Sequence, residues 1–166
     1  MFHFLSSRRR HLLLAAGILM LMFLTATPLL AAPMPSFKIS AVKGGDIDSH
    51  QYHGKVLLIN FFATWCPPCR QEIPSLIELQ KEFGPKGLSV IGISVDQGGS
   101  GIVKKLVEKL GINYPVGMGT GRVADDFGGV VGIPMTFLVD RQGNMVKTYQ
   151  GLIDEAQVKA DLKKVL

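Results

Sequence analysis

Two cysteines, Cys66 and Cys69, are the residues of this 166-residue chain whose type and spacing most directly predict chemistry. They are its only cysteines, and they form a Cys-Pro-Pro-Cys sequence. Such a pair can be a structural disulfide, part of a metal site, or a redox centre that alternates between dithiol and disulfide. A bridge that closes so small a loop stabilises a fold by about 2 kcal/mol or less. A purely structural role is therefore poorly motivated.

A zinc site is the next alternative, because zinc takes about four Cys, His or carboxylate ligands. His50 and His53 precede Cys66 at His-x-x-His spacing. They lie next to a Gly54-Lys55 turn that leads into an apolar strand. That strand should carry the histidines away from its far end, where the cysteines follow. We therefore expect a redox pair and no bound metal.

A buried strand and a helix are expected to position the two cysteines. Residues 56–62 are apolar except for Asn60, which is typical of a central strand buried on both faces. Residues 70–83 place apolar side chains at mostly helical spacing. Pro67 and Pro68 fit the start of that helix, where no backbone donor is missed. The sequence therefore predicts a dithiol at a strand-to-helix junction.

This junction suits thiol chemistry, because the thiolate that attacks a disulfide must be accessible and have a pKa lowered towards ambient pH. Cys66 would lie just ahead of the helix, where free backbone N–H groups and the positive end of the helix dipole stabilise a negative sulfur. Cys69 would lie one turn into the helix and be more buried. We expect Cys66 to be the attacking thiol and Cys69 the resolving thiol.

The remainder of the chain alternates strands and helices, so the fold class is α/β. This alternation implies a central sheet with a parallel β-α-β core and right-handed crossovers, and the last two strands form an antiparallel hairpin. The sheet is therefore mixed. Strands are expected over residues 37–39, 47–48, 88–95, 114–116, 137–140 and 145–150, and helices over 102–110, 122–127 and after Asp154.

Residues 1–32 have the pattern of an export segment. Three arginines, residues 8–10, precede a long apolar run that contains no acidic residue. The run is long for a removable signal and its cleavage-site residues are imperfect, so a cleaved signal peptide and a membrane anchor over residues 11–32 both stay open. The basic residues ahead of the run would place residues 33–166, as one domain, outside the cytoplasm.

The export segment also accounts for most of the positive charge. The whole chain has 18 basic and 13 acidic residues, for a net charge of +5. Removing the three arginines leaves 15 basic residues and a net charge of +2. The sequence has no basic patch with interleaved aromatic residues, so we expect no nucleic acid partner.

Two sequence blocks and the export segment together resemble the TlpA/ResA-like thiol-disulfide oxidoreductases of the thioredoxin superfamily, including the branch that serves cytochrome c maturation. The blocks are residues 60–72 (NFFATWCPPCRQE) and 132–140 (GIPMTFLVD), and the resemblance spans residues 37–166. It implies a thioredoxin-like three-layer α/β/α fold. It also implies an enzyme whose redox-active disulfide, Cys66–Cys69, needs no further cofactor.

The resemblance further implies a substrate surface and partners. In similar proteins the proline that matches Pro134 is cis and packs beside the cysteine pair, which leaves a backbone edge at Ile133 for substrate pairing. Trp65, Pro67 and Pro68 would shape the same surface. The implied substrates are disulfide-containing exported proteins such as apocytochrome c, and the implied electron donor is a membrane thiol protein of the DsbD/CcdA type. We expect a monomeric domain.

Glu72 and Asn60 are expected to determine the proton chemistry. Ordinary thioredoxins have a buried aspartate six residues before the first cysteine, whereas this chain has Asn60, which cannot titrate. Glu72 matches an acidic residue of the TlpA/ResA-like proteins, and one helical turn places it on the same face as Cys69. We expect Glu72 to tune the dithiol and to accept or donate a proton. The alternative is a solvated helix residue.

Trp65 directly precedes Cys66 and is the only tryptophan of the chain. We expect its ring to pack near Cys66, where it would shield the site and contact the substrate. The alternative is a large hydrophobic side chain that merely caps the fold.

The residues between the cysteines also bear on the direction of electron transfer. Strongly oxidising members of the superfamily tend to have a histidine there, which helps to stabilise the reduced thiolate, whereas this chain has Pro67 and Pro68. We therefore expect a reductant. A thiol peroxidase is an alternative that shares the fold, but its Pro-x-x-x-Thr/Ser-x-x-Cys signature is missing, since Ala63 stands three residues before Cys66. A dithiol metal or copper chaperone is a further alternative.

Overall fold

The computed structural model describes residues 32–166. The expected export segment, residues 1–32, therefore lies outside the described residues except for Ala32. Between Ala32 and the C-terminus, no helix combines the length and the apolar character needed to cross a membrane.

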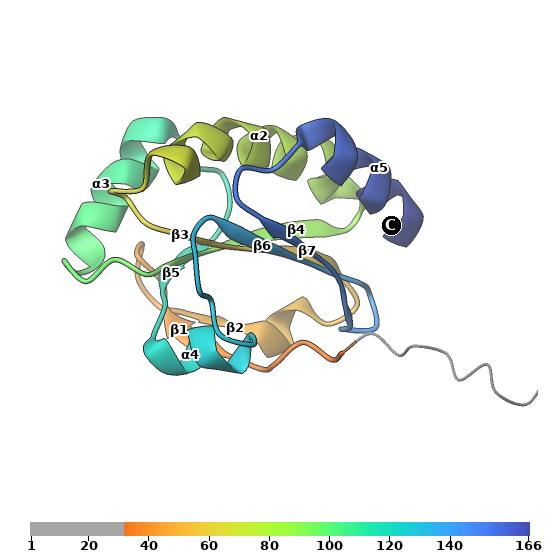
Figure 1. The fold of residues 1–166 in the computed structure, drawn as a ribbon, viewed down its shortest axis with the longest axis horizontal. Helices are drawn as coiled ribbons and strands as arrows, with labels where there is room; N and C mark the ends of the chain where they lie inside the picture. The colour runs from red at the N-terminus through yellow and green to blue at the C-terminus, as the bar shows by residue number, and fades with distance from the viewer. Residues whose placement is uncertain (1–31) are drawn as a thin grey trace, which may run out of the picture. The chain divides into compact units, whose positions relative to one another are not determined.

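A five-stranded mixed sheet forms the centre of this part of the chain (Figure 1). Strand β3 lies in the middle, parallel to β4 on one side and antiparallel to β6 on the other. Strand β5 continues the parallel half and β7 the antiparallel half. In spatial order the strands are β5 (Val116–Met118), β4 (Leu88–Ser94), β3 (Val56–Phe62), β6 (Met135–Val139) and β7 (Met145–Gln150).

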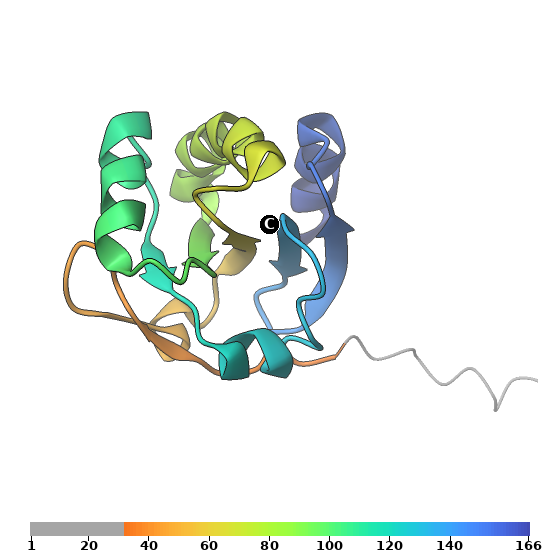
Figure 2. The same cartoon turned by 60° about the vertical axis from the view of Figure 1, so that its left-hand side comes forward.

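Helices cover one face of the sheet, and a helix together with a small hairpin covers the other (Figures 1 and 2). The first layer contains α2 (Pro67–Phe83), α3 (Ser100–Leu110) and α5 (Glu155–Val165). The second contains α4 (Gly121–Asp126), the antiparallel pair β1 (Lys38–Ser40) and β2 (Asp46–Asp48), and the 3-10 turn η1 (Ser49–Tyr52). A second 3-10 turn, η2 (Gly84–Lys86), ends α2. The expected three-layer α/β/α arrangement with a C-terminal hairpin is confirmed.

Strand β3 is buried at every position, as its apolar sequence predicts. Successive side chains of a strand point to opposite faces, and the two faces of β3 belong to two separate hydrophobic clusters. Val56 and Leu58 pack with the helices of the first layer. Leu57, Ile59 and Phe61 pack with the second layer. The strand that leads to the cysteines is therefore held from both sides.

Several element boundaries differ from the sequence expectation. Helix α2 is not among them: it begins at Pro67 with Cys66 as its N-cap, so the prediction that the two prolines start this helix is confirmed. Strand β5 covers Val116–Met118 rather than residues 114–116. Strand β6 begins at Met135, two residues earlier than expected.

The described chain begins alongside the turn between β6 and β7. The backbone N–H of Met34 donates to the carbonyl of Gly143 across 2.8 Å, and that of Met145 donates to the carbonyl of Ala32 across 2.8 Å. In the β3–β6 register Leu57 lies opposite Val139. This turn is therefore at the end of the sheet where β3 begins, and the cysteines follow its other end.

Candidate active site

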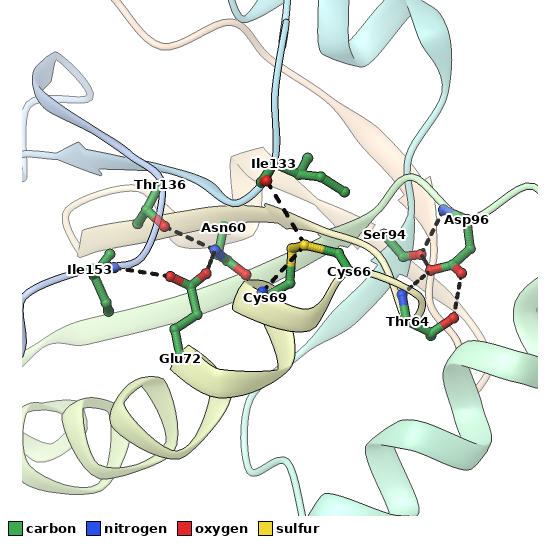
Figure 3. The surroundings of a disulfide bond; sticks show 10 residues. All are labelled: Asn60, Thr64, Cys66, Cys69, Glu72, Ser94, Asp96, Ile133, Thr136 and Ile153. Atoms are coloured by element: carbon green, nitrogen blue, oxygen red, sulfur yellow. Dashed lines mark hydrogen bonds between the residues drawn. A yellow bond between two sulfur atoms is a disulfide. The ribbon is translucent and has the colours of Figure 1, made fainter.

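Cys66 and Cys69 form a disulfide at the start of α2 (Figure 3). Their Cα atoms are 5.3 Å apart. Cys66 is the N-cap residue, and the backbone N–H of Cys69 donates to its Sγ across 3.3 Å. Cys66 is 3% exposed and Cys69 is fully buried. The expected strand-to-helix junction is confirmed, and Cys66 is the more accessible of two well-covered sulfurs.

The loop before β6 lies against the disulfide. The peptide bond between Ile133 and Pro134 is cis, as the resemblance implied. The carbonyl oxygen of Ile133 lies 3.9 Å from Cys66 Sγ (Figure 3), while Pro134 is buried. Residues 67 positions apart in sequence thus meet at Cys66 Sγ.

Glu72 lies inside the protein behind the disulfide, with 1% of its surface exposed. The side-chain amide of Asn60 donates to Oε1 across 2.6 Å, and the backbone N–H of Ile153 donates to Oε2 across 3.3 Å. The same Asn60 nitrogen donates to Thr136 Oγ1 across 2.9 Å (Figure 3). The alternative of a solvated helix residue is wrong. Thr136, although it belongs to the 132–140 block, and Ile153 were not predicted as site residues, because no local pattern links them to Glu72.

Burial raises the pKa of Glu72 to about 7, although the hydrogen bonds from Asn60 and Ile153 lower it. A carboxyl group with this pKa is present in both protonation states near neutral pH and can both accept and donate a proton. The nearby Tyr114 is also buried, and its pKa is raised chiefly by burial and further by the charge of Glu72. Glu72 is therefore the group on this side of the disulfide that suits proton exchange.

Trp65 is 66% exposed. Most of its surface faces solvent, so the alternative of a side chain that merely caps the fold is wrong. That the ring shields Cys66 and contacts the substrate stays a prediction. Trp65 lines a cleft of about 500 Å³ together with Asp96, Val131 and Ile133. Trp65 thus lies at the rim of the site, where a partner can contact it.

Pro67 and Pro68 occupy the first two positions of α2, and both are exposed. They form the surface between the cysteines without leaving a backbone donor unpaired. His50 and His53 lie ahead of β3, at the opposite end of that strand, with Nδ1 and Nε2 3.3 Å apart. Among residues 32–166, no three His, Cys, Asp or Glu side chains converge in a way that could hold a metal ion.

Residues 30–148 match the sequence model of the AhpC/TSA family. The chain belongs to the AhpC/TSA family. That match covers well over half of its length, including both cysteines, Glu72 and Pro134, and the members of this family have thioredoxin-like folds.

Within the AhpC/TSA family, the chain is similar to thiol-disulfide oxidoreductases named ResA. It is 31% identical over 131 residues to ResA of Bacillus anthracis, which covers 79% of this chain and 75% of that protein. It is 30% identical over 124 residues to ResA of Bacillus subtilis, which covers 75% and 69%. The expected thiol-disulfide oxidoreductase class is confirmed.

A solved structure supports the same assignment. The crystal structure of a thiol:disulfide interchange protein of the thioredoxin family from Chlorobium tepidum is similar, with a TM-score of 0.75 and 36% sequence identity. The similarity covers 81% of this chain and 96% of that one. This member of the AhpC/TSA family therefore has both the fold and the dithiol of a thiol-disulfide oxidoreductase.

Proposed function

We propose that this chain is an extracytoplasmic thiol-disulfide reductase that acts through Cys66 and Cys69. The observation that carries the proposal is the placement of Cys66. Its sulfur caps the N-terminus of α2, lies beside the carbonyl of Ile133, and has the buried carboxyl of Glu72 one turn beyond Cys69.

In the reduced enzyme, the Cys66 thiolate attacks one sulfur of a substrate disulfide. A new S–S bond joins Cys66 to the substrate, and the other substrate sulfur leaves as a thiolate. The Cys69 thiolate then attacks Cys66 Sγ, which forms the enzyme disulfide and releases the second substrate thiolate. Two electrons move from the enzyme to the substrate.

Glu72 is proposed to exchange the proton that this cycle requires. Cys69 must lose its proton before it can attack, and Glu72 has a pKa near 7 on the same side of α2. Asn60 cannot take this role, because an amide does not titrate in this range. The proton acceptor thus comes from the helix rather than from β3.

The direction of transfer is proposed from the residues between the cysteines. Pro67 and Pro68 supply neither a charge nor a side-chain donor to a Cys66 thiolate, so the reduced form lacks the extra stabilisation found in strong oxidants. A measured reduction potential well above about −200 mV would contradict a reductant.

The location and the partners are proposed from the first 32 residues and from the relatives. The export pattern supports a location outside the cytoplasm, either as a secreted domain or tethered to the inner membrane by residues 11–32. An oxidising compartment requires a source of electrons, for which we propose a membrane thiol donor of the DsbD/CcdA type. The proposed substrates are disulfides of exported proteins, with apocytochrome c foremost, and the domain acts as a monomer with no bound cofactor.

Trapping in cells tests the proposal. Replacing Cys69 with serine removes the resolving thiol, so Cys66 should remain in mixed disulfides with its partners. These adducts should disappear in the Cys66→Ser/Cys69→Ser double variant and after reduction. Mass spectrometry of the adducts identifies the partners. Recovery of no Cys66-dependent adduct would count against the reductase.

A thiol peroxidase is the second candidate, because the matching family is described by the names AhpC and TSA. The residue three positions before Cys66 is Ala63 rather than Thr or Ser, so the hydroxyl of the peroxidase signature is missing. Consumption of hydrogen peroxide by the reduced protein at a rate above its disulfide reduction would favour this function. Native mass spectrometry with and without a chelator would reveal a metal or copper chaperone.

A further inference from the structure

Asp96 is hydrogen-bonded to the turn that carries Cys66, although it lies in the loop after another strand, β4. Its Oδ2 accepts from the backbone N–H of Thr64 across 2.9 Å, and its Oδ1 accepts from the Thr64 hydroxyl across 2.5 Å. The Ser94 hydroxyl donates to Oδ2 across 2.8 Å (Figure 3). Both oxygens of the Asp96 carboxylate therefore accept hydrogen bonds, and two of the three donors belong to Thr64.

The parallel pairing of β3 and β4 creates this contact. Phe62 lies opposite Ser94 at the ends of the two strands, and the backbone N–H of Val95 donates to the carbonyl of Phe62 across 2.9 Å. Because the carboxyl ends of parallel strands lie at the same edge of a sheet, Asp96 emerges next to Thr64. The two residues are 32 positions apart in the sequence.

The two ends of the turn, Ala63 and Cys66, are buried, whereas its middle has few other constraints. One backbone hydrogen bond closes it, from Cys66 N–H to the carbonyl of Ala63 across 3.2 Å. Trp65 is 66% exposed, so burial of its ring does not hold the turn. Asp96 lines the clefts on both sides of Trp65. Its bonds to Thr64 therefore link the middle of the turn to the end of β4.

We propose that Asp96 is a positioning residue for disulfide exchange, which fixes the Thr64–Trp65 turn so that Cys66 Sγ stays at the N-terminus of α2 and Trp65 stays at the rim. The role is geometric and does not require the negative charge. It rests on the proposed role of Cys66 as the attacking thiol.

Two substitutions separate geometry from charge. In Asp96→Asn, the amide oxygen can accept from Thr64 N–H and Ser94, while the amide nitrogen can donate to the Thr64 hydroxyl, which is also an acceptor. All three contacts survive without the charge. In Asp96→Ala, all three are lost.

The pKa of Cys66 distinguishes a positioning role of Asp96 from an effect of its charge. This pKa is measured from the pH dependence of iodoacetamide alkylation of the reduced full-length protein. A displaced turn moves Cys66 Sγ away from the Cys69 N–H and the helix dipole, which raises the thiol pKa. Loss of a nearby carboxylate charge alone would lower it. We expect a higher Cys66 pKa in Asp96→Ala and no rise in Asp96→Asn.

Rates of disulfide reduction should follow the same order. Asp96→Ala should reduce kcat/KM about tenfold or more, because a misplacement of about 1 Å can cost a hundredfold. Asp96→Asn should stay close to the wild type. Thr64→Val should lower kcat/KM less than Asp96→Ala does. The double variant should have nearly the same kcat/KM as Asp96→Ala, since both substitutions remove the contact between Thr64 and Asp96.

Asp140→Ala is the matched control for lost stability. Asp140 also accepts backbone hydrogen bonds, from Gln142 and Asn144, at the opposite end of the sheet. It should lower the stability without changing the Cys66 pKa. A wild-type pKa and rate in Asp96→Ala, or equal losses in Asp96→Ala and Asp96→Asn, would overturn the positioning role. A wild-type Cys66 that does not react at all would instead contradict the proposed function.

Discussion

The side-chain amide of Asn60 donates a 2.6 Å hydrogen bond to the carboxyl group of Glu72. The two side chains come from β3 and α2 and meet behind the disulfide, where both are buried. Since an amide cannot titrate in this range, the pair has one ionisable member. Of these two side chains, only Glu72 can therefore exchange a proton.

Replacing Glu72 with glutamine should remove one ionisation from the pH profile of disulfide reduction. In the wild type, a group with a pKa near 7 is available to accept the Cys69 proton. In Glu72→Gln, the rate near neutral pH should fall about tenfold or more, and the pKa of at least one cysteine should shift. Stopped-flow kinetics and thiol alkylation across pH measure both. If both the cysteine pKa values and the profile stay unchanged, Glu72 has no proton role.

Glu72 should also make the stability of the oxidised protein pH-dependent. Its pKa is raised from 4.5 to about 7, so the folded chain keeps a proton that the unfolded chain releases between these values. The stabilisation is fully present below about pH 4.5 and is lost as the pH rises through about 7. Across this window, the free energy of unfolding should fall by roughly 2 to 3 kcal/mol more than in Glu72→Gln.

Urea denaturation at several pH values, with the disulfide intact, measures this difference. Glu78→Gln is the matched control, because Glu78 lies on the same helix with an exposed side chain. The free energy of unfolding of Glu78→Gln should depend on pH as that of the wild type does. If the free energies of unfolding of the wild type and Glu72→Gln change with pH in parallel, Glu72 is not the source of the pH dependence.

Replacing Asn60 with aspartate should place two carboxyl groups in contact inside the protein. Like charges this close cannot both ionise without a large cost, so the pair should share one proton over a wide pH range. We expect a marked loss of stability above neutral pH and a smaller loss at pH 5. Denaturation at the two pH values tests this, with Asn113→Asp, an exposed site, as the control. Equal losses at both pH values would show that repacking, not charge, dominates.

Replacing Trp65 with alanine should impair recognition of protein substrates and leave the fold stable. The ring is 66% exposed, so its removal opens no cavity in the core. We expect kcat/KM for a protein disulfide to fall about tenfold, as for an aromatic anchor in an interface. Reduction of a small aromatic disulfide should change little. Val146→Ala, an exposed apolar site on β7, is the control, and equal losses for both substrates would place Trp65 in the chemical step.

Sequence reasoning located the dithiol and its supporting elements, because a continuous apolar run such as β3 and a helix begun by prolines have strong local signals. It also placed Glu72 correctly, since one helical turn fixes its face relative to Cys69. It missed the contacts of Thr136 and Ile153 with Asn60 and Glu72, because they depend on the pairing of β3 with β6 and on the path of the loop before α5. Asp96 gave no signal, because a lone aspartate after a strand is typical of a loop. The exposure of Trp65 could not be predicted, because tryptophan side chains are highly buried on average.

The pairing of Ala32 and Met34 with the β6–β7 turn has a practical consequence for any attachment of this protein. That turn is at the end of the sheet where β3 begins, and the seven residues of β3 span about 20 Å before the chain reaches the cysteines. A surface, tag or lipid layer joined ahead of Ala32 therefore connects to the domain at the end remote from the dithiol. A partner protein that reacts with Cys66 therefore binds at the end of the sheet opposite this point of connection.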